Sequence, residues 1–259
     1  MCIRDSSHFL LNYITSDNVH RQTEGYFDPT VMPLVNYWGF GYTPKKAVTD
    51  VDSIRIESIM NSVGFSKWSD QIGMKGMQYI KPERAKLDFS AIAKGYAVDK
   101  VGALLESNGI NNYIVEIGGE IFCKGQKAQN KPWTIALSKP EITAKINNVQ
   151  MTVQLNGVGL ASSGNYRNFH KINDKIYGHE INPMTGFPEM NDLLGVSVIA
   201  SQCMIADAYA TAFMVMGLEK SKDLVEKLPD TEAVFFYASD DQNILSTFSS
   251  GFRKYLKSE

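Results

Sequence analysis

The second half of the chain is divided into short segments in which apolar and polar residues alternate, and this pattern constrains the fold most strongly. Alternation with a period of two is typical of β-strands that bury one face. Residues 133–137, 151–155 and 157–161 alternate in this way and are predicted strands. Short runs of strand-forming residues predict further strands at residues 113–117, 121–124, 193–199, 233–238 and 244–248. Because a Gly-Gly turn follows the first of these strands and polar residues separate the last two, we expect antiparallel hairpins.

Helices are expected in fewer places than strands. Apolar residues on one helical side indicate a helix at residues 8–16. The remaining segments are predicted helices at residues 48–63, 91–108 and 205–217, a short strand at 85–89, and a loop rich in Gly, Pro and aromatic residues at 25–44. Because strands outnumber helices and hairpins recur, the sequence predicts an α+β fold.

The composition is that of a folded protein with a large core. The 259 residues are 44% hydrophobic and 11% aromatic, and we expect a single domain over residues 1–259. The chain has 26 Lys and Arg residues and 28 Asp and Glu residues, so its net charge is −2. A charge of this size does not attract a nucleic acid. No apolar run approaches the roughly 18 to 20 residues of a membrane span. The three cysteines are too few and too scattered for a disulfide framework or a zinc site. We expect Cys2, Cys123 and Cys203 to be small, buried hydrophobic side chains.

Two polar side chains in the predicted helix at 205–217 form a candidate metal site. Asp207 and Thr211 are four residues apart and therefore share one helix face. A carboxylate and a hydroxyl suit a hard cation such as Mg²⁺ rather than zinc. The alternative is structural, with Asp207 favoured by the helix dipole and Thr211 bonded back to a carbonyl oxygen.

A strand-to-helix turn at residues 87–99 forms a candidate phosphate site. Asp88 ends the predicted strand, the chain turns through Ser90, and Lys94 lies one turn into the helix. The unpaired backbone groups of the turn and a lysine together can bind a diphosphate. Neither the P-loop spacing nor the Gly-x-Gly-x-x-Gly pattern is present. The alternative is a surface lysine opposite an exposed aspartate.

Two further segments carry aromatic rings and a histidine. Residues 24–41 combine aromatic and hydrogen-bonding side chains, which suits a flat heterocycle but is also typical of core loops. Residues 161–167 and 178–186 are interpreted as a hairpin-like pair with His179 just before a turn. The alternative for His179 is a structural role.

In this order, these blocks resemble the ApbE family, the FAD:protein FMN transferases. The resemblance covers about residues 25–217 and rests on residues 25–41, 88–99, Gly118-Gly119-Glu120, 163–167, 179–186 and 206–212. It implies an ApbE-like (T-fold-like) α+β fold, in which mixed and antiparallel sheets and packed helices form a flavin cleft.

The resemblance also implies an activity and a role for individual residues. The expected reaction is the Mg²⁺-dependent transfer of FMN from FAD to a Ser or Thr hydroxyl of an acceptor protein, with release of AMP. The resemblance implies that the Ala91 carbonyl, Asp207 and Thr211 bind the metal. It implies catalytic roles for His179 and Lys94. The residues implied to bind FAD are Tyr26, Phe27, Asp28, Asp88, Lys94 and Ile181. The alternatives are an FAD pyrophosphatase with water as acceptor and a non-catalytic flavin-binding protein, which would not need the metal pair.

The chain departs from the family pattern at several positions. Asn182 and Glu120 each stand where many members have Asp. Members usually begin upstream with a strand carrying a Met-Gly-Thr motif, so we expect that the first strands are missing and that Met1–Ser7 is foreign to the fold. The resemblance implies a membrane-associated redox protein as acceptor and a periplasmic or membrane-anchored location, although Met1–Ser7 contains no signal peptide and Cys2 follows no lipobox.

Overall fold

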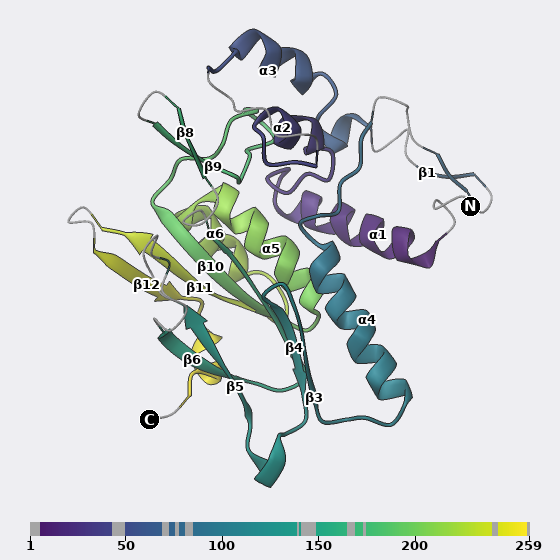
Figure 1. The fold of residues 1–259 in the computed structure, drawn as a ribbon, viewed down its shortest axis with the longest axis vertical. Coiled ribbons are helices and arrows are strands. Elements are labelled where there is room, and N and C mark those ends of the chain that lie inside the picture. Colours follow the sequence, from purple (N-terminus) through teal and green to yellow (C-terminus); the bar gives the residue numbers. More distant parts are fainter. Residues whose placement is uncertain are drawn as a thin grey trace. The chain divides into compact units, whose positions relative to one another are not determined.

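The computed structural model describes most of the chain, as two compact units. The described residues are 6–42, 50–68, 73–75, 78–80, 85–138, 140, 149–164, 169–172, 175–239 and 243–257. The first unit comprises Met1–Ser90 and Asn168–Met190, and the second comprises Ala91–Arg167 and Asn191–Glu259 (Figure 1). The expectation of a single domain stays a prediction.

The first unit combines helices with two small hairpins. Its elements are α1 (Ser7–Gln22), α2 (Met32–Tyr37), α3 (Ser53–Met60), β1 (Gly73–Lys75), β2 (Gln78–Ile80), β8 (Phe169–Ile172) and β9 (Lys175–Gly178). The Ser6 side chain accepts a hydrogen bond from the His8 amide and so caps α1. Trp38, at the end of α2, is fully buried, and its indole donates to the Gly186 carbonyl oxygen at 2.9 Å. This bond fixes the segment after β9 against α2.

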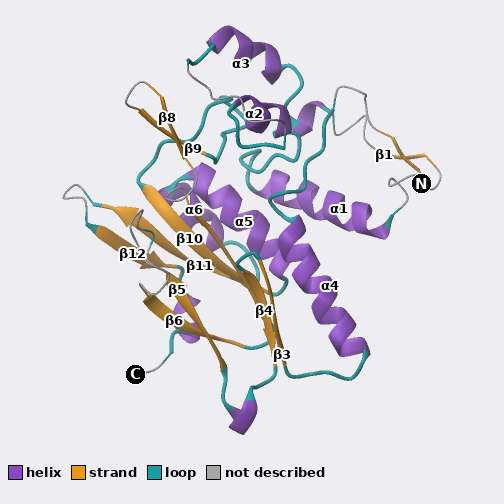
Figure 2. Cartoon of the chain, viewed as in Figure 1, coloured by secondary structure: helices purple, strands orange, loops and turns teal. Residues whose placement is uncertain are grey.

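The second unit is built on a six-stranded antiparallel sheet (Figure 2). The strand order is β12 (Ile244–Phe248), β11 (Thr231–Ala238), β10 (Leu193–Ala200), β7 (Val158–Gly164), β4 (Glu120–Lys124) and β3 (Tyr113–Ile117). The hairpin of β5 (Trp133–Ser138) and β6 (Val149–Leu155) is a separate two-stranded sheet. The helices are α4 (Ala93–Ser107), α5 (Cys203–Met216) and α6 (Leu218–Val225).

The two faces of the sheet are covered by different elements. A Cβ on Gly159 of β7 would lie 2.4 Å from the Cα of Cys203, so the start of α5 packs directly on this face. The next residue, Leu160, points to the opposite face because successive side chains of a strand alternate. There it joins a buried cluster with Leu137 and Val153 of the β5–β6 hairpin. The sheet is therefore packed on both faces, and its central strands β10 and β11 are buried along most of their length.

Most predicted strands and helices are confirmed. The strands at 113–117 and 244–248 have the predicted bounds, and the predicted helices at 91–108 and 205–217 are α4 and α5. The α+β fold is confirmed, and none of the helices in the described part of the chain has the length and apolar content of a membrane span. Cys123 and Cys203 are buried free thiols, and burial raises the pKa of Cys123 to about 12.

Several predictions are wrong in detail. Residues 85–89 form no strand, because the Asp88 amide donates to the Pro29 carbonyl oxygen instead of joining a sheet. The predicted loop at 25–44 contains α2, which has a proline in its first turn. Residues 161–164 do not pair with 178–186, since β7 pairs with β4 and β10 while Gly178 pairs with Phe169. Residues 165–167 of the Ser163–Arg167 block, and residues 1–5 and 43–49, lie outside the described part of the chain.

Candidate functional site

The predicted metal ligand Asp207 lies where α5 crosses α4 in the second unit. Its side chain is buried, and Oδ2 accepts a hydrogen bond of 2.9 Å from the Gly95 amide of α4. A Cβ on Gly95 would come within 2.4 Å of the Cys203 carbonyl oxygen, so only glycine permits this approach of the two helices. Thr211, one turn further along α5, is partly buried. Both predicted side-chain ligands therefore belong to one helix, as their spacing requires.

Burial makes the ionised form of Asp207 unfavourable. Loss of solvent raises the pKa of Asp207 to about 6, against its ordinary value of 3.8, although the Gly95 amide opposes the shift. The carboxylate of Glu120 raises this pKa further, whereas the charge of Lys94 lowers it. A cation beside Asp207 would offset this cost, so the electrostatics favour binding of a positive ion.

Lys94 forms an ion pair within the same unit. Its ammonium group, in the first turn of α4, pairs with Oε1 of Glu120, the first residue of β4. The Lys94 side chain is 47% exposed, whereas that of Glu120 is 3% exposed. The other oxygen, Glu120 Oε2, is buried and accepts no hydrogen bond from the part of the chain that the structure describes. The sequence prediction did not include Glu120 in the site, although an acid directly after a Gly-Gly turn was a visible signal.

Asp99 is a second carboxylate that the sequence prediction missed. It lies on α4, and its two oxygens accept hydrogen bonds from the amides of Cys203 and Met204 at 2.8 and 2.9 Å. These are the first amides of α5, which the helix itself leaves unpaired. Asp99 therefore fixes the N-terminus of α5 on α4 and so positions Asp207.

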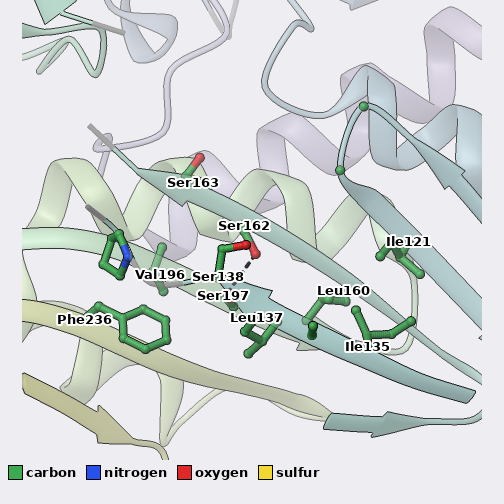
Figure 3. Close-up of a pocket in the computed structure, with 15 residues that line it drawn as sticks. Ile121, Ile135, Leu137, Ser138, Leu160, Ser162, Ser163, Val196, Ser197 and Phe236 are labelled. Carbon is green, nitrogen blue, oxygen red and sulfur yellow. Dashed lines mark hydrogen bonds between the residues drawn. The ribbon is translucent and has the colours of Figure 1, made fainter. Parts of the chain in front are cut away.

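A pocket of about 310 Å³ opens beside the turn that precedes Glu120. Gly118 and Gly119 of this turn are among its lining residues. Figure 3 labels ten of the others. The hydroxyls of Ser162 and Ser197 lie 2.7 Å apart on adjacent strands of the sheet and point toward one another. The other pocket-lining residues labelled in Figure 3 are Ile121, Ile135, Leu137, Ser138, Leu160, Ser163, Val196 and Phe236. The walls of this pocket come together only in the tertiary structure, so no pattern within one segment predicts it.

The residues present fit a hard divalent cation. The predicted ligands are the Asp207 carboxylate, the Thr211 hydroxyl and the carbonyl oxygen of Ala91, and all belong to the second unit. Oxygen donors of this kind suit Mg²⁺. Within the described residues no group of three His, Cys, Asp or Glu side chains could hold a metal. The predicted set contains a single carboxylate. Because burial raises the pKa of Asp207, its ionised form would gain from a nearby cation.

In the first unit, Asp28 holds the loop after α1. Its Oδ1 accepts hydrogen bonds from the amide and hydroxyl of Thr30, and its Oδ2 accepts one of 2.7 Å from the Phe65 amide. Phe27 is buried, and its carbonyl oxygen lies 2.7 Å from Nδ1 of His20. Tyr26 is partly exposed. Of the three residues predicted to contact FAD here, Tyr26 therefore has the side chain most accessible to a ligand.

Asp88 lies against the same loop. Its amide donates to the Pro29 carbonyl oxygen at 2.7 Å, which brings it next to the residues predicted to bind FAD. Its carboxylate Oδ1 accepts hydrogen bonds from the amide and hydroxyl of Ser90. Asp88 therefore organises the turn that precedes α4.

His179 and Ile181 lie just after β9. The His179 side chain is 31% exposed, and its Nε2 is 3.3 Å from Oε1 of the buried residue Glu180. Ile181 is buried in a cluster with Leu34 and Trp38. The Asn182 amide donates to the Glu189 carboxylate at 2.9 Å. An aspartate at position 182 could not donate this hydrogen bond and would place a second negative charge beside Glu189.

Most of the chain matches the model of one protein family. A model of the ApbE family matches residues 6–235. The chain belongs to the ApbE family. Its relatives include proteins named "FAD:protein FMN transferase" from Escherichia coli K12, 35% identical over 95% of this chain and 69% of the relative, and from Vibrio cholerae O395, 37% identical over 90% of this chain and 68% of the relative.

Solved structures of ApbE proteins agree with the fold. "Flavin Transferase ApbE from Vibrio cholerae" has a TM-score of 0.83 and 33% identity, covering 97% of this chain and 77% of its own. The apo form of the Pseudomonas stutzeri "flavinyl transferase ApbE" has a TM-score of 0.85 and 30% identity, covering 98% of this chain and 76% of its own. The ApbE fold is therefore confirmed, and the chain is an enzyme of the transferase class.

The predicted site residues of this ApbE protein divide between the two units. The metal ligands and Lys94 belong to the second unit, together with Glu120. The residues predicted to bind FAD around Asp28 and Asp88, and those at His179 and Ile181, belong to the first unit. Their functional roles stay predictions.

Proposed function

We propose that this chain transfers FMN from FAD to a Ser or Thr hydroxyl of an acceptor protein, with release of AMP, in a Mg²⁺-dependent reaction. The observation that carries the proposal is Asp207, a buried carboxylate with a raised pKa on the same helix as Thr211, in a chain of the ApbE family. Pure flavin storage has no use for such a group, because a buried ionised carboxylate costs stability.

The phosphate chemistry belongs to the second unit. Asp207, Thr211 and the Ala91 carbonyl would hold Mg²⁺, which when bound withdraws negative charge from a diphosphate. The Lys94 ammonium binds the same diphosphate through its remaining N–H groups. In the reaction the acceptor oxygen bonds to the FMN phosphorus. The bond from that phosphorus to the bridging oxygen breaks, and AMP leaves with this oxygen and the electron pair.

The proton of the acceptor hydroxyl requires a base, and His179 is the proposed one. A histidine suits this task because it changes charge near neutral pH. The Glu180 carboxylate lies 3.3 Å from Nε2 of His179 and stabilises the imidazolium that forms when the ring takes the proton. Tyr26, Phe27, Asp28, Asp88 and Ile181 are the proposed residues of the FAD-binding part of the site.

The proposal is tested by incubating the chain with FAD, MgCl₂ and an acceptor protein or Thr-containing peptide, followed by mass spectrometry. Transfer gives a mass gain equal to one FMN on the acceptor and an equal amount of AMP. Free FMN with AMP and no adduct would instead indicate the pyrophosphatase. Binding of FAD without any AMP, with or without EDTA, would indicate the non-catalytic flavin-binding protein. Asp207→Asn should abolish AMP release while FAD still binds.

The nature and location of the acceptor are part of the same proposal. From the family resemblance, the acceptor is a membrane-associated redox protein, and the reaction takes place in the periplasm or at the membrane. The test is to measure flavin covalently bound to membrane proteins of the source cells. Loss of this flavin when the gene for this chain is deleted would support this location.

A further inference from the structure

Stability alone does not explain the burial of Glu120. One oxygen of its carboxylate pairs with Lys94, but Oε2 is buried and receives no hydrogen bond from the described residues. A buried charged group with an unmade hydrogen bond is costly, and buried ion pairs are often no more stable than apolar replacements. A carboxylate retained in this setting therefore indicates a task other than holding the fold together.

The backbone at Glu120 belongs to a tight hairpin. Glu120 pairs with Ile117 across a turn formed only by Gly118 and Gly119, whose φ angles are +64° and +103°. Such a tight turn needs positive φ angles, which glycine adopts at low cost. The hairpin therefore holds the Glu120 carboxylate at a fixed place.

Lys94, by contrast, has a long side chain that is about half exposed. A lysine of this kind samples many rotamers unless a partner restrains it. A Cβ on Gly118 would lie 3.4 Å from the Lys94 Cδ and 3.5 Å from Glu120 Oε2. The ion pair thus lies against the backbone of the turn.

We propose that Glu120 is a positioning residue for Lys94. Its fixed carboxylate holds the ammonium group in one place beside Asp207, so that the positive charge is already in position when negative charge develops on the leaving AMP. The inference rests on the proposed function, in which Lys94 binds the FAD diphosphate. Glu120 itself does not need to touch the substrate.

The main test is Glu120→Gln, which keeps the shape of the side chain and removes its charge. Because a misplaced group loses transition-state stabilisation, we expect kcat for AMP release to fall about 10- to 100-fold while KM for FAD changes less than about threefold. Glu120→Asp keeps the charge with a shorter reach and should retain more activity than Glu120→Gln. Equal losses in the two variants would indicate a packing role and overturn the inference.

A double-mutant cycle tests whether Glu120 acts through Lys94. Lys94→Met removes the ammonium group, and adding Glu120→Gln to it should lower kcat no further than about twofold, because the group to be positioned is gone. If Glu120 acted independently, the two losses would multiply, and the inference would be wrong. Circular dichroism and thermal melting show which variants are folded. If Glu120→Gln does not fold, the kcat of Glu120→Asp is compared with that of the wild type instead.

A matched control breaks another ion pair between the same two elements. Glu106 of α4 pairs with Lys124 of β4 at 2.6 Å, and Glu106→Gln should leave kcat within about twofold of the wild type.

The wild-type rate separates the two proposals. No AMP release by the wild type contradicts the proposed function, whereas an active wild type with an equally active Glu120→Gln variant overturns only the positioning role.

Discussion

Replacing Asp207 by asparagine should stabilise the protein at neutral pH while abolishing the reaction. The asparagine side chain is neutral at every pH, and its amide oxygen can still accept the hydrogen bond from the Gly95 amide. The wild-type carboxyl has a pKa of about 6 in the folded protein, mainly because burial disfavours its charge. In the unfolded chain it returns to the ordinary value of 3.8. The substitution therefore removes a destabilising charge from the folded state.

The sign and size of the effect follow from these two values. Well below pH 3.8 the carboxyl is protonated in both states, so it does not affect the free energy of unfolding. As pH rises, the unfolded chain ionises first, and wild-type stability falls relative to that of Asp207→Asn until the folded carboxyl also ionises. The linkage relation gives a penalty of about 0.5 kcal/mol at pH 4 and about 3 kcal/mol at pH 7.5. Asp207→Asn should be the more stable protein by up to these amounts.

Urea denaturation in EDTA at pH 4 and pH 7.5 measures the difference. Asp192→Asn is the control, because it removes an exposed carboxylate of the same unit and should keep the pH dependence of the wild type. Added MgCl₂ should raise the stability of the wild type at pH 7.5 and leave Asp207→Asn unchanged, since a ligand stabilises only a state that binds it.

An Asp207→Asn variant less stable than the wild type at pH 7.5 in EDTA would refute this reasoning. It would mean that the Gly95 amide and the charge of Lys94 stabilise the ionised carboxylate by more than burial destabilises it. Equal stabilisation of both proteins by Mg²⁺ would remove Asp207 from the metal site.

Three further substitutions test other parts of the two units. His179→Ala should slow FMN transfer about 100-fold and change FAD affinity less than about threefold, as measured by flavin fluorescence; equal losses would exclude a base. Asp28→Asn should lower the free energy of unfolding by about 1–3 kcal/mol in urea, because an NH₂ group would face the donors of Thr30 or Phe65. Asp99→Ala should cost about 1–2 kcal/mol by leaving the first amides of α5 unpaired, and an unchanged urea midpoint would contradict this capping role.

The strands of the second unit could be predicted because their signal is local. Tyr113–Ile117 and Ile244–Phe248 are short runs of strand-forming residues with turn residues on both sides, so their bounds follow from the segment itself. The helix α2 gave no such signal. It lies in a segment rich in Gly, Pro and aromatic residues, and it is stabilised by a bond from Trp38 to Gly186, 148 residues away. Contacts of that range are invisible to a pattern within one segment.

The candidate site shows the same division. Asp207 and Thr211 could be predicted as a pair because one helix turn separates them, and a spacing rule describes that relation. Glu120 was missed because its partner, Lys94, is 26 residues away in a different element. The sequence shows only an acid after a turn, and neither its burial nor its unpaired oxygen can be derived from that pattern.

The buried and partly buried carboxylates of this chain differ in how many hydrogen bonds the protein itself supplies. Asp28 and Asp99 accept hydrogen bonds at both oxygens, so each is fully engaged in holding a loop or a helix end. Glu120 has one oxygen that accepts no hydrogen bond from the described residues, and Asp207 has a pKa raised mainly by burial. Because folding favours complete pairing of buried polar groups, incomplete pairing indicates carboxylates that serve a purpose other than holding the fold together. On this ground the same Asp→Asn change should destabilise the protein at position 28 and stabilise it at position 207.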